Sequence, residues 1–140
     1  MSYFTTKDNT RIYYKDWGSG STVILIHGWP LSSDSWDDQA IALVNAGHRV
    51  IAYDRRGFGR SSQPWHGYDY NTLADDLAAL ISHTAVNDVA LVGFSMGGYL
   101  ALSYVLTQPL TETSNELATE QPIKQSIKRQ TLFPSWQSIA

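Results

Sequence analysis

The stretch VALVGFSMGGYLAL, residues Val89–Leu102, carries the pattern that decides the fold. It begins with a short, continuous apolar run, which is typical of a parallel strand covered on both faces. The next five residues, GFSMG, match G-x-S-x-G, the pattern of a sharp turn from strand to helix that projects a serine hydroxyl from the sheet. The small residues Gly93 and Gly97 allow the chain to approach itself closely there. The stretch therefore predicts a strand, a turn that presents Ser95, and a helix.

Strand and helix signals alternate along the preceding chain. Capping-box patterns predict helix starts at Ser35 and at Thr72, and Gly47 predicts the end of the first of these helices. Alternating and buried-type apolar patterns predict a hairpin of residues 3–5 and 11–17, strands over 22–26, 49–53 and 88–92, and a last helix over 96–107. A hairpin followed by β-α-β-α-β-α predicts an α/β fold with an open, mostly parallel sheet and flanking helices.

A second motif follows the strand that ends before His27. The sequence HGWP lies where this architecture places an oxyanion donor. Pro30 has no N–H group, so the available donor is the amide of Trp29, paired with the amide of Met96 at the start of the last helix. Two amides aimed at one point would stabilise the oxyanion of a tetrahedral acyl intermediate. Because His27 precedes the tight turn at Gly28, we interpret it as a structural residue packed under the loop.

Three segments together carry a family resemblance: HGWPLSSDSW, YDRRGFGRSSQPWHGYDYNTLADDL and GFSMGG. They resemble the α/β-hydrolase superfamily, and in combination its non-heme chloroperoxidase branch of perhydrolases and esterases, over residues 1 to about 107. The resemblance implies a serine-nucleophile enzyme that needs no cofactor and no metal. Such enzymes hydrolyse small esters, and with hydrogen peroxide they convert a carboxylic acid to a peracid that oxidises halide.

The resemblance also implies roles for individual residues. By motif position, Ser95 would be the nucleophile, and the backbone amides of Trp29 and Met96 would be the oxyanion donors. Trp29 and Phe94 would wall the acyl pocket. His27, Gly28, Gly93 and Gly97 would belong to the structural motif that holds these groups in place.

The acid and the histidine of a catalytic triad are missing from the pattern. In this fold they follow the serine along the chain, on loops after later strands. Downstream of Ser95 the sequence has only Glu112, Glu116 and Glu120 as carboxylates, and it has no histidine. We therefore expect residues 1–108 to form the N-terminal part of a hydrolase domain without its C-terminal strands, helices and cap.

We expect residues 109–140 to be a divergent polar tail, disordered or translated out of frame. The chain would then be a fragment, a frameshift product or one half of a split enzyme, and inactive alone. A catalytically inactive module that binds an acyl ligand is the alternative. In the family's strand order, the strand Asp88–Val92 is interior. Without its missing neighbour it would offer an apolar edge for self-association.

Composition excludes several function classes. The formal net charge of −3 gives no reason to expect nucleic acid or an anionic membrane as a partner. The sequence has no cysteine, which excludes disulfides, thiolate metal sites and cysteine nucleophiles and is compatible with a reducing compartment. The first twenty residues contain no apolar leader, and no apolar run approaches the length of a membrane span. These features favour a soluble, cytoplasmic protein.

Three weaker patterns favour structural roles. The run GFGRSS, residues 57–62, resembles a dinucleotide fingerprint but lacks its third glycine and its helix. Asp75 and Asp76 point about 100° apart on a helix, so we interpret them as an acidic pair in the first turn rather than as a catalytic pair. The remaining histidines are His48, His66 and His83, and they are too scattered to form a metal site. His83 lies near a predicted helix end and is interpreted as solvated or as a C-terminal cap.

Overall fold

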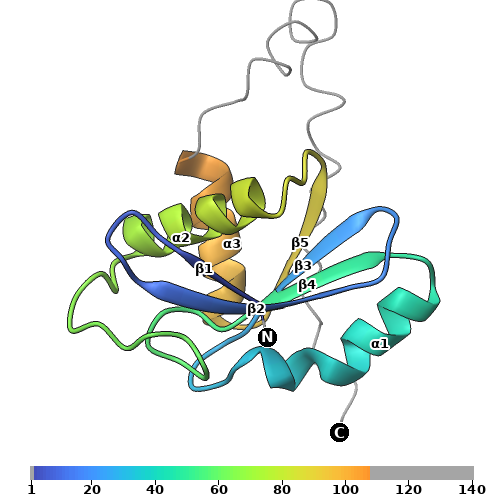
Figure 1. The fold of residues 1–140 in the computed structure, drawn as a ribbon, viewed down its shortest axis with the longest axis horizontal. Helices are drawn as coiled ribbons and strands as arrows, with labels where there is room; N and C mark the ends of the chain where they lie inside the picture. Colours follow the sequence, from blue (N-terminus) through green and yellow to red (C-terminus); the bar gives the residue numbers. More distant parts are fainter. Residues whose placement is uncertain (1, 108–140) are drawn as a thin grey trace, which may run out of the picture.

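A computed structural model describes residues 2–107 as a five-stranded sheet with helices on both faces (Figure 1). The predicted polar tail, residues 109–140, lies outside the described residues. In chain order the elements are β1 (Ser2–Thr5), β2 (Arg11–Trp17), β3 (Thr22–Ile26), a 3₁₀ turn η1 (Ser33–Trp36), α1 (Asp37–Asn45), β4 (Arg49–Tyr53), α2 (Tyr70–His83), β5 (Val89–Gly93) and α3 (Met96–Thr107).

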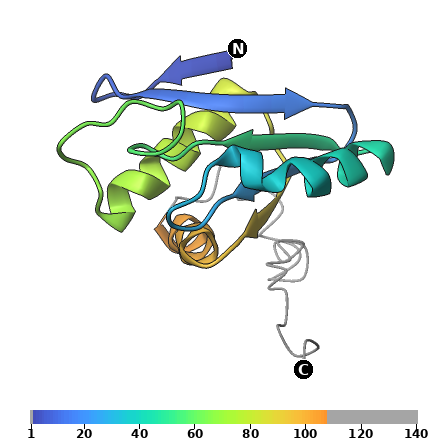
Figure 2. The same ribbon diagram turned by 90° about the horizontal axis from the view of Figure 1, so that it is seen from below.

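The strands follow the order β1-β2-β4-β3-β5 across the sheet, and Figure 2 shows this succession from β1 near the N-terminus to β5 beside α3. β1 and β2 form the predicted antiparallel hairpin, and β2 is also antiparallel to β4. The other three strands, β4, β3 and β5, are mutually parallel, so the predicted α/β fold with a mostly parallel central sheet is confirmed. Within residues 2–107, β5 pairs only with β3 and is therefore an edge strand.

The apolar side chains of β3 alternate between two helical layers because successive strand residues point to opposite faces. Val23 and Leu25 pack in the layer of α1, whereas Ile24 and Ile26 pack in the layer of α2 and α3. Figure 1 shows α2 and α3 on one side of the sheet and α1 on the other. All five residues of β3 are buried, which explains why this strand is continuously apolar.

Both predicted helix starts were wrong by a few residues. The first helical segment begins with η1, whose cap is Ser32 and not Ser35, and α1 follows from Asp37. The cap of α2 is Asp69 and not Thr72: its carboxylate accepts the Thr72 amide at 2.9 Å and the Thr72 hydroxyl at 2.7 Å. In both cases a polar side chain nearer the N-terminus reaches the free amides of the first turn.

The prediction that Asp75 and Asp76 occupy a first helical turn was also wrong. Because α2 already begins at Tyr70, Asp76 lies in its second turn, where it is buried. Its carboxylate accepts two hydrogen bonds from the Arg56 guanidinium, at 2.6 and 2.7 Å. Arg56 is itself buried and also pairs with Asp8 at 2.8 Å. This cluster ties the β1–β2 turn and the loop after β4 to α2.

Residues 2–107 contain neither a membrane-spanning helix nor a cluster of metal ligands. None of the helices there combines the length and the apolar character that a membrane crossing requires. In the same part of the chain, no three histidine or carboxylate side chains gather in a way that could hold a metal ion.

Candidate active site

The ends of β3 and β5 bring the two predicted motifs together. The parallel register pairs Ile26 with Gly93, and the Phe94 amide donates to the Ile26 carbonyl at 3.1 Å. The loops that follow both strands are in direct contact at Gly28. A β-carbon at that position would lie 3.0 Å from the Phe94 carbonyl oxygen and 3.2 Å from the Ser95 β-carbon. Glycine therefore permits the approach of the HGWP loop to the serine turn.

Ser95 stands at a strained turn between β5 and α3. Its φ of 54° lies in the left-handed region, which costs a non-glycine residue about 1 to 2 kcal/mol. The turn is closed by the Gly97 amide, which donates to Phe94 at 2.9 Å, and by the Gly98 amide, which donates to Ser95 at 3.0 Å. The Ser95 residue is exposed. This is the backbone that a G-x-S-x-G nucleophile turn requires.

The glycines that flank Ser95 are required by close backbone contacts. A β-carbon on Gly93 would collide with the backbone of Gly97 and Gly98, and one on Gly97 would collide with the Ile26 carbonyl. The start of α3 thus packs directly on the end of β3. Only residues without a side chain allow this packing.

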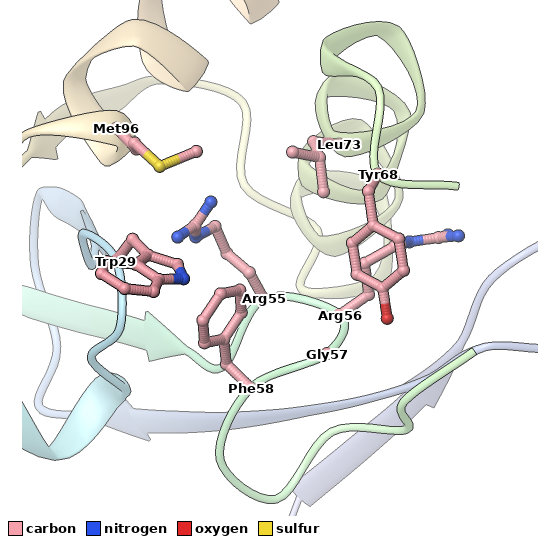
Figure 3. A pocket seen from close by; sticks show the side chains of 8 residues that line it. All are labelled: Trp29, Arg55, Arg56, Gly57, Phe58, Tyr68, Leu73 and Met96. Atoms are coloured by element: carbon pink, nitrogen blue, oxygen red, sulfur yellow. The ribbon is translucent and has the colours of Figure 1, made fainter. Parts of the chain in front are cut away.

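Two backbone amides near Ser95 are free to donate. Within residues 2–107, the amides of Trp29 and Met96 make no hydrogen bond. Met96 is the first residue of α3, where helix amides have no partner in the helix and the helix dipole favours negative charge. The side chains of Trp29 and Met96 line the same cavity (Figure 3).

That cavity has a volume of about 420 Å³. Besides Trp29 and Met96, its lining comes from the loop after β4 and from the start of α2: Arg55, Arg56, Gly57, Phe58, Tyr68 and Leu73. The predicted pocket wall Phe94 is half-buried and is not among the lining residues. The sequence motifs did not predict that the loop after β4 lines the cavity. A signal for this loop was available in the sequence, because the loop follows a parallel strand and ligands in α/β sheets bind beyond the carboxyl ends of such strands.

His27 has no free ring nitrogen. Its Nε2 accepts the Arg55 backbone amide at 3.0 Å, so Nδ1 carries the proton and donates to the Gly28 carbonyl at 2.8 Å. Burial lowers the pKa of His27 to about 4, which keeps the ring neutral. The ring also packs edge-on against Phe58 at 5.4 Å. These contacts favour a structural role, in which His27 joins the loop after β3 to the loop after β4.

The other three histidines are engaged elsewhere. His48 contacts the Ser21 hydroxyl through Nδ1 at 2.7 Å, and His66 packs beside Trp65. His83 is exposed at the end of α2 and stacks on the Phe4 ring at 5.5 Å. Within the part of the chain that the structure describes, the Ser95 hydroxyl has no hydrogen-bond partner. Residues 2–107 therefore contain no histidine that is hydrogen-bonded to Ser95.

The loop between β4 and α2 is anchored by Asp54. Its buried carboxylate accepts the backbone amides of Ser33 and Arg60, both at 2.7 Å. The glycine-rich run from Gly57 folds within this loop, where the Gly57 amide donates to Ser62 at 2.9 Å. Since α2 begins only at Tyr70, this run does not open a helix, in contrast to a dinucleotide-binding loop.

Comparison with known proteins agrees with the geometry. Residues 21–111 match the model of the alpha/beta hydrolase fold family. A non-heme chloroperoxidase of Kitasatospora aureofaciens is 52% identical over 105 residues, which are 75% of this chain and 38% of that protein. A bifunctional esterase/perhydrolase of Acinetobacter calcoaceticus is 47% identical over 111 residues, 78% of this chain and 40% of the relative.

Solved structures are similar over the same region. An esterase from Exiguobacterium antarcticum superposes with a TM-score of 0.75 at 41% identity, and a bromoperoxidase from Bacillus anthracis with a TM-score of 0.71 at 54% identity. Each match covers 76% of this chain and 40% of the solved chain. The chain thus spans about two fifths of the length of the relatives it matches. On the combined observations of strand order, serine turn and sequence match, the chain belongs to the α/β-hydrolase fold family.

Proposed function

We propose that this chain supplies the nucleophile and the oxyanion site of an esterase of the non-heme haloperoxidase type. The observation that carries the proposal is the exposed Ser95 at a left-handed turn, beside two amides that have no acceptor within residues 2–107. Relatives that are 47%, 52% and 54% identical to this chain are named as an esterase/perhydrolase, a chloroperoxidase and a bromoperoxidase. The assignment of Ser95, Trp29 and Met96 to one site is supported by the contact of the HGWP loop with the serine turn at Gly28.

The chemistry would follow the acyl-transfer scheme. The Ser95 oxygen attacks the carbonyl carbon of a small ester, and its proton passes to a base and then to the departing alcohol. The negative oxygen of the tetrahedral intermediate accepts hydrogen bonds from the amides of Trp29 and Met96. Water then releases a carboxylic acid from the acyl-enzyme, whereas hydrogen peroxide releases a peracid. Neither route calls for a cofactor or a metal.

The base must come from outside the residues described above. Both nitrogens of His27 are occupied, and the sequence downstream of Ser95 contains no histidine. We therefore propose that the chain alone turns over esters at most in trace amounts. A serine hydroxyl without an adjacent base is a weak nucleophile at neutral pH, so Ser95 should react slowly and only with activated esters. A second candidate, an acyl-binding module, is favoured by the unpartnered Ser95 hydroxyl.

Turnover of p-nitrophenyl acetate tests the proposal. The full chain is compared with Ser95→Ala and with Ser82→Ala, a matched control at an exposed helical serine on α2. We expect slow release of p-nitrophenol that Ser95→Ala reduces and Ser82→Ala leaves unchanged. Equal rates for the unaltered chain and Ser95→Ala would remove the assignment of Ser95 as nucleophile. Fast turnover that depends on Ser95 would mean that the sequence already contains a base.

A further inference from the structure

Arg55 is a buried charge that has no counter-charge within residues 2–107. It is 2% exposed, and its Nε and Nη2 atoms are enclosed without any hydrogen-bond acceptor. No carboxylate within residues 2–107 forms an ion pair with it. Its neighbour Arg56 is equally buried but pairs with Asp76 and Asp8. An unpaired buried guanidinium is strongly destabilising, so Arg55 has an unmet requirement for an anionic acceptor.

The guanidinium of Arg55 lies in the lining of the cavity beside the serine turn. Figure 3 shows it extending from the loop after β4 to the space between Trp29 and Met96. The Phe58 ring lies against it, with the guanidinium carbon 4.9 Å from the ring centroid. Burial lowers the pKa of Arg55, but arginine stays protonated near neutral pH. The cavity therefore combines apolar walls with the Arg55 guanidinium, beside Arg56, whose charge is already paired.

We propose that Arg55 binds a carboxylate group carried by the ester, remote from the carbonyl that Ser95 attacks. The inference rests on the proposed function and adds a substrate class: monoesters of short dicarboxylic acids. Nη1 is the guanidinium nitrogen that is not enclosed, so it can donate a charge-assisted hydrogen bond to a carboxylate, and apolar walls strengthen such a bond by excluding water. The volume of about 420 Å³ lies within the usual range for small-ligand sites. Trp29 and Met96 line the same cavity and would hold the ester end.

Binding of two matched esters to the full chain tests the inference. Monomethyl glutarate carries one carboxylate, and dimethyl glutarate has the same chain length without a charge. Calorimetry or NMR titration should show roughly tenfold or greater preference for the monoester, as expected for a charge-assisted hydrogen bond. Arg55→Met should abolish the preference, and the exposed control Arg11→Met should keep it. Equal affinities for the two esters, or a preference that survives Arg55→Met, would overturn the inference.

Thermal unfolding gives an independent readout. Without ligand, Arg55→Met should raise the unfolding midpoint, because it removes an unpaired buried charge and keeps an apolar side chain of similar reach. Monomethyl glutarate should raise the midpoint of the unaltered chain and leave that of Arg55→Met unchanged. A lower midpoint for Arg55→Met without ligand would contradict the inference by revealing a structural role. Arg55→Lys, which keeps the charge but replaces the planar guanidinium with a flexible ammonium, should retain a reduced preference for the monoester.

The inference and the proposed function fail separately. The same titrations are repeated with Ser95→Ala, in which the carboxylate site is intact. Monoester preference in this variant, without Ser95-dependent turnover in the unaltered chain, would retain Arg55 as a carboxylate site and reject the esterase function. Ser95-dependent turnover without any monoester preference would support the esterase function and reject Arg55 as a carboxylate site.

Discussion

The ion pair between Arg56 and Asp76 provides a sharp test of how the loop after β4 is held. Asp76→Asn removes the negative charge that faces a buried guanidinium at 2.6 and 2.7 Å. Breaking a buried pair by removing one partner costs about 3 to 5 kcal/mol. Asp8 still contacts Arg56 at 2.8 Å, so we expect the lower end, about 3 kcal/mol. This is a large part of the stability of an ordinary domain, about 5 to 15 kcal/mol.

Urea unfolding at neutral pH measures the effect. With a typical slope of about 1 to 3 kcal/mol per molar urea, the Asp76→Asn midpoint should fall by about 1 to 3 M. The adjacent, exposed Asp75→Asn is the matched control and should stay within about 0.5 kcal/mol of the unaltered chain. The double variant Arg56→Met with Asp76→Leu should be more stable than Asp76→Asn, because it leaves no buried unpaired charge and Asp8, which loses its partner, is partly exposed. Equal midpoints for Asp75→Asn and Asp76→Asn would refute the reasoning.

Three further predictions concern the packing of the site and the edge of the sheet. Gly97→Ala should destabilise the chain by about 1 to 3 kcal/mol in urea unfolding, because the added methyl group would collide with the Ile26 carbonyl. An unchanged urea midpoint would contradict this prediction by showing that α3 can shift to make room. The pKa of His27 in the folded chain is about 4, below its ordinary value of 6.5, so the unfolded chain binds a proton at higher pH than the folded chain does. The free energy of unfolding should therefore fall by about 3 kcal/mol as the pH drops from 6.5 to 4. His27→Gln should lack this part of the pH dependence, and a parallel profile for both would contradict it. Because β5 is an edge strand within residues 2–107, we expect concentration-dependent association that Ala90→Lys reduces; light scattering that shows a monomer at every concentration would count against it.

The sheet could be predicted from the sequence because its signals are local. β3 and β4 are short runs of buried apolar residues, and each ends within a residue of its predicted boundary. The serine turn was equally visible, since Gly93 and Gly97 are required by contacts at the turn itself. These features depend on neighbours along the chain or on the strand alongside.

The charges around the cavity could not be predicted, because their environment depends on distant parts of the chain. The sequence pattern favours Asp76 as an acidic residue of the first helical turn, but it is buried against Arg56, twenty positions earlier in the sequence. Adjacent arginines have opposite surroundings: Arg56 has two carboxylate partners, and Arg55 has none within the described residues. No local pattern separates them, since both belong to one loop and differ only in the direction of their side chains.

Reconstitution of ester turnover tests the central claim most directly. The full chain is mixed with the C-terminal part of the Acinetobacter calcoaceticus esterase/perhydrolase, which aligns with this chain over 40% of its own length. If Ser95, Trp29 and Met96 form a site that needs only a base, hydrolysis of p-nitrophenyl acetate should rise by several powers of ten on mixing, and Ser95→Ala should abolish the gain. A stable complex of the two polypeptides with no gain in turnover, or a gain that survives Ser95→Ala, would contradict the account.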